Sequence, residues 1–381
     1  MGLNQYQYYR PQTAPDVPVA LEQPLDRAKP KRRWLKRSLL AFFILLFAAI
    51  AAAGYVGWKF FGTTTQLFGG TPLGNAVAML EPATLKGEAG QVNVLLIGNS
   101  VDNPGHPAAD LTDSIMLASL DTNTNKAVLV SIPRDLYVNI PEYGYQKINA
   151  AYRFGQIENF SEAGYPPGGT GLLQKVLQEE LGIDINYHVL VNYAALRNAV
   201  NAVGGVAVDI QSPDPRGIYD PNISAVDGGP LLLSNGPQKL DGQTALNLAR
   251  ARGEAPPDGR IPYGLPRSDF NRSEHQRQIV LALKEKATQP DVLFNPFRLG
   301  ALLDAIGTNV TTDLKINEAR ALAQFVAGLD DSALRPVGLG DENVNLLTGY
   351  TTRDGQSAVI PAAGLDDFSD IKAFIKTSLR D

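Results

Sequence analysis

Residues 128–140 read Val-Leu-Val-Ser-Ile-Pro-Arg-Asp-Leu-Tyr-Val-Asn-Ile, and the rest of the chain can be placed around them. The aliphatic run up to Ile132 is typical of a buried strand, and Pro133 ends it because proline donates no ladder hydrogen bond. Arg134 and Asp135 therefore lie where an interior strand opens into a loop. Because α/β sheets often bind ligands at strand ends, this charged pair is either a structural ion pair or part of a site.

The composition is that of a globular protein with a sizeable core, since 44% of the 381 residues are hydrophobic and 19% are charged. The chain contains no Cys, which excludes disulfides, thiolate nucleophiles and Cys metal sites. Its three histidines, His106, His188 and His275, are scattered without ligand spacing. This argues against a zinc site and against a Ser-His-Asp triad.

The N-terminal part predicts a basic tail followed by a membrane helix. Residues 1–37 are rich in Gln, Pro and Tyr, and they carry eight Lys and Arg against three Asp and Glu, a net charge of +5. Residues 38–58 contain no charged residue and are long enough to cross a bilayer. A cleaved signal peptide is the competing interpretation, but the long preceding tail favours an uncleaved anchor. The positive-inside rule then places the tail in the cytoplasm and the rest of the chain outside the plasma membrane.

We predict five consecutive parts. They are a disordered basic tail (1–37), a transmembrane helix (38–61), a stalk (62–90), a large external domain (91–330) and a C-terminal extension packed on the same domain (331–381).

Within the external part, strand and helix signals alternate. The predicted strands are 93–98, 114–120, 127–132, 187–191, 206–210 and 357–360. The predicted helices are 170–181, 193–203, 242–251, 271–287, two more within 297–329, and a last one from Phe368, while 213–237 is rich in Pro and Gly and is predicted to be a loop. This alternation predicts an α/β domain, a three-layer αβα sandwich with a central mixed sheet.

Several cations of the otherwise acidic external part fall at the ends of predicted elements. They are Arg134, Lys147, Arg250, Arg252 and Arg272. Asp269 opens the helix that carries Arg272, and Gln276 follows one turn later. Arginine's planar fork matches the oxygens of a phosphate, so an arginine-rich pocket indicates a phosphoryl or pyrophosphoryl ligand. Each arginine alone could instead be a helix C-terminal charge or a surface ion pair, but the set together favours an anion pocket.

The order of the motifs resembles the LytR-CpsA-Psr family. The matching pieces are NVLLIG (93–98), TDSIML (112–117), SIPRD (131–135), KINAAY (147–152), VGGV (203–206), LDGQTAL (240–246), ARAR (249–252) and SDFNR (268–272). These pieces cover about residues 91–286 and occur in the same order as in the family. The ordered set is far more specific than any one piece. A single membrane anchor with an external domain also fits the family.

The resemblance implies a membrane-anchored phosphotransferase. Such an enzyme moves a glycopolymer from a polyprenyl pyrophosphate carrier to an acceptor hydroxyl of peptidoglycan or another wall polymer, and forms a phosphodiester. By matching position, the side chains that would bind the pyrophosphate are Arg134, Lys147, Arg250, Arg252, Arg272 and Gln276. Asp113 would help hold Mg²⁺ or Mn²⁺, and Asp135 and Asp269 would orient the arginines or accept the acceptor's proton. An apolar cavity between sheet and helices would house the lipid chain.

Three positions depart from the family pattern. The family usually has Asp where this chain has Ser100, Arg where it has Leu111, and Arg where it has His275. Asp113 is then the remaining carboxylate of the metal motif, although Asp102 or Asp110 lies close enough in sequence to substitute. Mg²⁺ often keeps several waters and uses few carboxylates, so the metal site could survive the loss.

The departures keep other functions open. A non-catalytic member would bind the polyprenyl pyrophosphate without turning it over, or would act as an envelope scaffold. A hydrolase would use the same pocket with water as the acceptor. The hypothesis of a nucleic-acid-binding regulator is supported only by the basic run 29–37. This run is adjacent to the membrane segment and no helix-turn-helix pattern accompanies it, so we expect no nucleic-acid partner.

Overall fold

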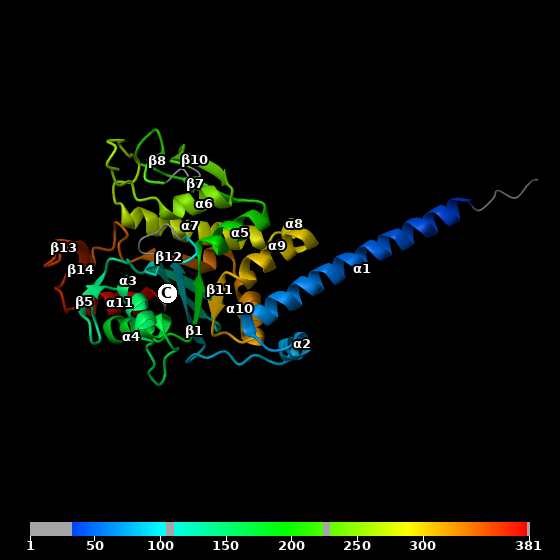
Figure 1. Cartoon of the computed structure of the whole chain (residues 1–381), viewed down its shortest axis with the longest axis horizontal. Coiled ribbons are helices and arrows are strands. Elements are labelled where there is room, and N and C mark those ends of the chain that lie inside the picture. The colour runs from blue at the N-terminus through cyan, green and yellow to red at the C-terminus, as the bar shows by residue number, and fades with distance from the viewer. Residues whose placement is uncertain (1–32, 104–109, 224–228, 379–381) are drawn as a thin grey trace, which may run out of the picture. The chain divides into compact units, whose positions relative to one another are not determined.

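The computed structural model describes residues 33–103, 110–223 and 229–378, so most of the predicted tail lies outside the described residues. The chain divides into two units, residues 1–50 and 51–381. Helix α1 (Arg33–Phe68) contains this division (Figure 1). Its part Ile44–Phe68, 25 residues with a mean hydropathy of 1.7, is long and apolar enough to cross a membrane. A single-pass membrane anchor near the N-terminus therefore fits this helix.

A six-stranded mixed sheet forms the centre of the second unit. In spatial order its strands are β11 (Val310–Thr312), β6 (Tyr187–Val191), β1 (Gln91–Asn99), β2 (Thr112–Asp121), β3 (Lys126–Ser131) and β12 (Leu334–Gly338). Strands β1, β2 and β3 form an antiparallel meander, whereas β6 runs parallel to β1 and β12 runs parallel to β3. The predicted central mixed sheet is confirmed.

Helices cover both faces of this sheet (Figure 1). Helices α3 (Asn149–Ile157), α4 (Gly169–Leu181) and α11 (Ser369–Ser378) share a hydrophobic core with the sheet residues Leu95 and Ile97. The alternate residues Val94 and Leu96 belong to a separate core with α10 (Ile316–Ala327), as expected of a strand covered on both sides. A further core joins α5 (Tyr193–Val203), α6 (Gly242–Arg250) and α7 (Asp269–Ala287). The predicted αβα sandwich is confirmed.

The region predicted as a loop, 213–237, contains short strands. Strand β8 (Ile218–Asp220) pairs with β9 (Leu231–Leu233), and β10 (Gly236–Leu240) starts in this region and pairs with β7 (Val206–Ile210). The prediction of irregular chain was wrong for β8 and β9, because strands of three residues leave almost no periodic pattern.

Residues 62–90, predicted as a stalk, contain the end of α1 and a second helix. Helix α2 (Pro72–Leu80) packs on α10, and the side chain of Arg320 donates to the carbonyl of Glu81 (3.1 Å). The end of α1 packs on α9 (Pro296–Gly307), where Lys59 forms an ion pair with Asp304 (2.7 Å). Helix α9 follows the short helix α8 (Pro290–Leu293).

Two hairpins lie next to each other beside the end of β3. They are β4–β5 (Tyr137–Ile140 and Gly144–Lys147) and β13–β14 (Leu347–Thr351 and Ser357–Pro361). The predicted strand at 357–360 and the last helix are confirmed, but β11, β12 and β13 were missed. Lys147 is the last residue of β5, and α3 begins two residues later at Asn149.

Candidate active site

The site forms where β2 begins and β3 ends. Asp113 is the second residue of β2, and Arg134 follows β3 after Pro133. Arg250 is the last residue of α6, and Asp269 and Arg272 lie in the first turn of α7. Elements far apart in sequence therefore bring the predicted site residues to one place.

Arg134 is the central cation of this cluster. Its Nη1 donates a short hydrogen bond to Oδ1 of Asp113, and its Nε lies 3.5 Å from Oδ1 of Asp269 and 3.8 Å from Oδ2 of Asp135. Burial opposes the charge of Arg134, but Asp269, Asp113 and Asp135 outweigh it and raise the pKa of the guanidinium. Arg134 is therefore a fixed, fully charged group at the base of the site.

Asp269 holds three guanidinium groups together. Its Oδ2 accepts a hydrogen bond from Nη2 of Arg272 (2.8 Å), and its Oδ1 lies 3.5 Å from Arg134 and 3.7 Å from Nη1 of Arg252. The Arg272 side chain is only 5% exposed and also donates to the backbone carbonyl of Asp113 (3.2 Å). Burial, together with repulsion from Arg134, lowers the pKa of Arg272. Such crowding of like charges favours binding of an anion.

The arginines open into a cavity of about 530 Å³ between the sheet and helices α5, α6 and α7. The predicted site residues that line it are Asp113, Arg134, Arg250, Arg252, Arg272 and Gln276. Its apolar wall includes Leu96, Met116 and Val189 from the sheet. One cavity thus joins a cationic end to an apolar wall, which is the arrangement that an amphiphilic phosphate ester requires.

Arg252 and Gln276 are also held by the protein itself. The buried carboxylate of Asp220 accepts hydrogen bonds from the backbone N–H groups of Arg252 (2.7 Å) and Gly253 (2.9 Å). Nε2 of Gln276 donates to the carbonyl of Ala249 (2.9 Å), so Gln276 ties α7 to α6 at the cavity wall.

Lys147 and Asp135 lie beside the cavity without lining it. Nζ of Lys147 is 3.0 Å from Oδ1 of Asp135, which in turn faces Arg134. Three predicted site residues therefore do not line the cavity and instead contact the arginines that do, or contact each other: Asp135, Asp269 and Lys147.

Tyr193 is a site residue that sequence reasoning missed. Its hydroxyl donates to Oδ2 of Asp113 (3.3 Å), and the guanidinium of Arg250 lies over its ring at 5.1 Å. Burial, with the charge of Asp113, raises the pKa of Tyr193 to about 12, so the hydroxyl keeps its proton. The available signal was its position at the start of a helix directly after β6.

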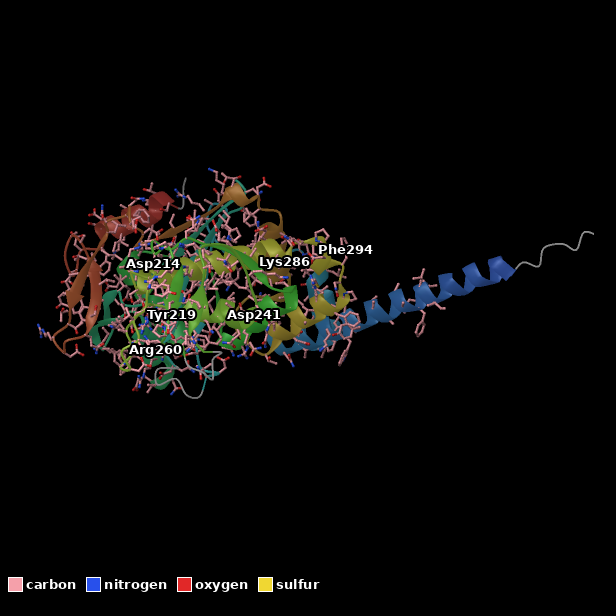
Figure 2. The ribbon with its side chains drawn as sticks, turned by 90° about the horizontal axis from the view of Figure 1, so that it is seen from above. Asp214, Tyr219, Asp241, Arg260, Lys286 and Phe294 are labelled. Carbon is pink, nitrogen blue, oxygen red and sulfur yellow. The ribbon has the colours of Figure 1, made fainter. Side chains whose placement is uncertain are left out.

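A further cluster of aromatic and charged groups includes Tyr219, the residue before the cavity residue Asp220. The rings of Tyr219 and Tyr263 lie 5.4 Å apart, and Arg216 lies over the ring of Tyr263 at 3.9 Å. Figure 2 shows Asp214, Tyr219 and Arg260 toward the end of the domain away from Phe294.

The oxygen atoms around Asp113 fit a small divalent cation. Oδ1 of Asn99 and Oγ of Ser114 are buried without a hydrogen-bond partner, both line the cavity, and β1–β2 pairing places them beside Asp113. No group of three or more His, Cys, Asp or Glu side chains with metal-ligand geometry occurs within 33–103, 110–223 and 229–378. One carboxylate with neutral oxygens suits Mg²⁺, which retains waters and binds substrate phosphates.

The two proposed substitutes for the missing carboxylate are engaged elsewhere. Asp102 accepts hydrogen bonds from the backbone N–H groups of Tyr193 (3.1 Å) and Ala194 (2.7 Å) at the start of α5, and Asp110 pairs with Arg153 (3.1 Å). Both carboxylates therefore have structural partners of their own.

The three departures from the family pattern fall outside the residues that line the cavity. Ser100 is fully buried and hydrogen-bonds with Tyr193, which makes it a neutral partner near Asp113. His275 is 7% exposed in α7, and burial lowers its pKa to about 4, so it is neutral at physiological pH. Leu111, half-buried just before β2, contributes no charge.

The chain is similar to a known protein family and to curated proteins. The LytR_cpsA_psr family model matches residues 75–353. The chain is 32% identical over 243 residues to "Polyisoprenyl-teichoic acid--peptidoglycan teichoic acid transferase TagU" of Oceanobacillus iheyensis, covering 63% of this chain and 64% of the relative, less than two thirds of its length. It is 25% identical over 328 residues to the transferase TagT of Bacillus subtilis, covering 81% of this chain and 87% of TagT.

The fold matches a solved structure titled "LytR-CPS2A-psr family protein YwtF (TagT) with bound octaprenyl pyrophosphate lipid". The TM-score is 0.52 at 22% identity, over 80% of this chain and 96% of the other. Because the family model covers residues 75–353, most of the chain, this protein is a member of the LytR_cpsA_psr family.

Proposed function

We propose that this protein is a membrane-anchored phosphotransferase that moves a glycopolymer from a polyprenyl pyrophosphate carrier to a cell-wall acceptor hydroxyl. The observation that carries the proposal is the single cavity of about 530 Å³ with Arg134, Arg250, Arg252 and Arg272 at one end and an apolar wall along the sheet. The arginines match a pyrophosphate and the wall matches a polyprenyl chain. The names of TagU and TagT, which are teichoic acid transferases, support the same activity.

The chemistry rests on positioning and electrostatics, as in other phosphoryl transfers. The acceptor oxygen bonds to the phosphorus that carries the glycopolymer, and the bond from that phosphorus to the bridging oxygen breaks. Polyprenyl phosphate leaves with the electron pair, and its negative charge is stabilised by the guanidinium groups. The hydroxyl proton passes to a carboxylate, either Asp135 or Asp269.

Asp135 is the better candidate for this proton. Asp269 faces three guanidinium groups, which occupy both of its carboxylate oxygens with ion pairs. Among the described residues, the Asp135 carboxylate pairs with Lys147 at 3.0 Å and has a longer contact to Arg134 at 3.8 Å. In this assignment Asp269 orients the arginines and Asp135 acts as the base.

Asp113, with Asn99 and Ser114 beside it, would hold Mg²⁺ or Mn²⁺, which would supply positive charge to the phosphate oxygens when bound. The hydroxyl of Tyr193 and the guanidinium of Arg134 keep the Asp113 carboxylate in one orientation. The basic segment before the apolar part of α1 supports a cytoplasmic N-terminus and an extracytoplasmic domain at the plasma membrane.

The test uses the full chain in detergent with a short-chain polyprenyl pyrophosphate saccharide, Mg²⁺ and a peptidoglycan oligosaccharide. Transfer should occur with the parent and should fall about 10²–10³-fold in Arg134→Ala, the usual loss for a group that stabilises transition-state charge. The matched control is Arg298→Ala, which removes an arginine of α9 that pairs with Asp291 of α8. This variant should keep full activity.

The outcomes separate the functions. Saccharide joined to the oligosaccharide supports the transferase. Free saccharide without an adduct would indicate a hydrolase, and tight lipid binding without either product would indicate a non-catalytic binding protein.

A further inference from the structure

A second, smaller cavity of about 190 Å³ lies between the β4–β5 and β13–β14 hairpins. Its lining is polar and aromatic, and consists of Tyr137, Gln146, Lys147, Thr352, Arg353, Asp354 and Gln356. The residues come from two hairpins more than 200 positions apart in the sequence, and the C-terminal hairpin provides four of them.

This cavity is connected directly to the proposed base. Lys147, which lines it, holds Oδ1 of Asp135 at 3.0 Å. The backbone N–H of Val359 in β14 donates to the carbonyl of Asp135 (3.0 Å), so the C-terminal hairpin is docked onto the residue itself. Arg134, the adjacent residue, lines the large cavity. The Arg134–Asp135 dipeptide therefore lies between the two cavities.

A row of three tyrosine rings runs along this surface. The ring centroids of Tyr145 and Tyr137 are 5.9 Å apart, and those of Tyr137 and Tyr350 are 5.5 Å apart, with interplanar angles of 32° and 34°. All three side chains are half-buried, and the hydroxyl of Tyr145 is anchored by a hydrogen bond to Asp366. Rigid aromatic faces with a polar edge offer an apolar surface to the C–H face of a pyranose ring.

Two polar side chains beside the rings have no partner of their own. Among the residues that the structure describes, the exposed side chains of Gln146 and Arg353 make no hydrogen bond or ion pair. An amide and a guanidinium are suitable donors to the hydroxyl, acetamido or carboxylate oxygens of a saccharide. The surface therefore combines stacking faces with free hydrogen-bonding groups, the pattern of a carbohydrate subsite.

We propose that the small cavity and the row formed by Tyr145, Tyr137 and Tyr350 bind the pyranose chain of the acceptor. This inference rests on the proposed function. In phosphoryl transfer the attacking and leaving oxygens lie roughly in line on opposite sides of the phosphorus. The donor pyrophosphate occupies the arginine cavity on one side of Arg134–Asp135. The acceptor hydroxyl then arrives from the hairpin side and gives its proton to Asp135.

The test measures each ligand separately on the full chain in detergent. The acceptor probe is a tetrasaccharide of alternating N-acetylglucosamine and N-acetylmuramic acid, and the donor probe is octaprenyl pyrophosphate. Tyr350→Ala and Arg353→Ala should each weaken tetrasaccharide binding by calorimetry, about tenfold for Tyr350→Ala, and raise the acceptor KM with little change in kcat. The affinity for octaprenyl pyrophosphate should be unchanged.

Tyr165→Ala is the matched control, because Tyr165 is a half-buried tyrosine that belongs neither to the cavity linings nor to the row of Tyr145, Tyr137 and Tyr350. This variant should bind both probes like the parent. Parent-like tetrasaccharide affinity in both site variants would overturn the subsite, as would an equal loss of both probes. Arg353 is exposed in a turn, so its variant tests the subsite even where Tyr350→Ala is less stable. If the parent binds the saccharide and the variants lose that binding, while the parent transfers nothing, the result would support the saccharide subsite and contradict the proposed transferase activity.

Discussion

The guanidinium groups of the site are already held by carboxylates before a phosphate arrives. Asp113, Asp135 and Asp269 fix Arg134, and Asp269 also fixes Arg272. Arginine side chains lose about 2 kcal/mol of rotamer entropy when they are ordered, and here the fold has ordered them in advance. A pyrophosphate therefore meets a preorganised set of donors, which favours both affinity and transition-state stabilisation.

His275 gives the chain a pH-dependent stability. Its folded-state pKa is about 4, below the ordinary value of 6.5, because burial disfavours the charged ring. Above pH 6.5 the ring is neutral in both states. As the pH falls from 6.5 to 4, the unfolded chain binds a proton that the folded chain cannot, so the free energy of unfolding falls by roughly 3 kcal/mol. We expect His275→Leu to lose this decline, measured by urea unfolding at pH 7 and pH 4.

The matched control is Gln278→Leu in the same helix, a change that removes a half-buried side chain that does not titrate. Its free energy of unfolding should differ from that of the parent by the same amount at both pH values. A parallel pH dependence of the parent and His275→Leu would show that this histidine is protonated in the folded state.

Sequence reasoning predicted most of the charged residues that line the cavity, but not the neutral residues beside them. Arg134, Arg250 and Arg272 could be predicted because they fall at the ends of predicted elements and within the motifs that resemble the family. Tyr193 and Ser114 could not, because a tyrosine at a helix start and a serine in a strand occur in most folds. Their roles depend on which strands pair, and pairing is set by contacts distant in sequence.

At the scale of elements, long periodic segments were predictable and short edge strands were not. The structure gives β6, α5 and β7 the predicted bounds, because each has a clear apolar period and a capping or turn residue at its end. Strands β8, β9 and β11 have three residues each, too few to show alternation. Strand β12 contains Pro336 and is stabilised at the sheet edge by pairing with β3.

The C-terminal helix α11 is part of the main core rather than an accessory. Ile371 is fully buried in the cluster that includes sheet residues Leu95 and Leu117. Truncating it to alanine leaves a cavity, so we expect Ile371→Ala to lower the free energy of unfolding by about 2–5 kcal/mol, measured as a shift in the urea midpoint. Lys376→Ala, exposed on the same helix, should change stability by less than about 0.5 kcal/mol. Equal, small effects of both changes would mean that α11 detaches from the core in solution.

At the scale of the whole molecule, charge asymmetry sets the expected topology. Residues 1–37 carry a net charge of +5, whereas the remainder, with 26 Lys and Arg against 36 Asp and Glu, carries −10. Positively charged segments next to a membrane helix stay on the cytoplasmic side, so the acidic domain should lie outside. Both proposed substrates, a wall acceptor and a lipid-linked polymer, would then be on the same side as the cavity.

The absence of cysteine makes this topology directly testable, because one introduced cysteine is the only thiol in the chain. Leu232→Cys, at a position that is 65% exposed in β9, should react with a membrane-impermeant maleimide in intact cells. Gln5→Cys, in the basic tail, should react only after the cells are permeabilised. The reverse pattern would place the domain in the cytoplasm, where a cell-wall acceptor is absent, and would contradict both the orientation and the proposed transfer reaction.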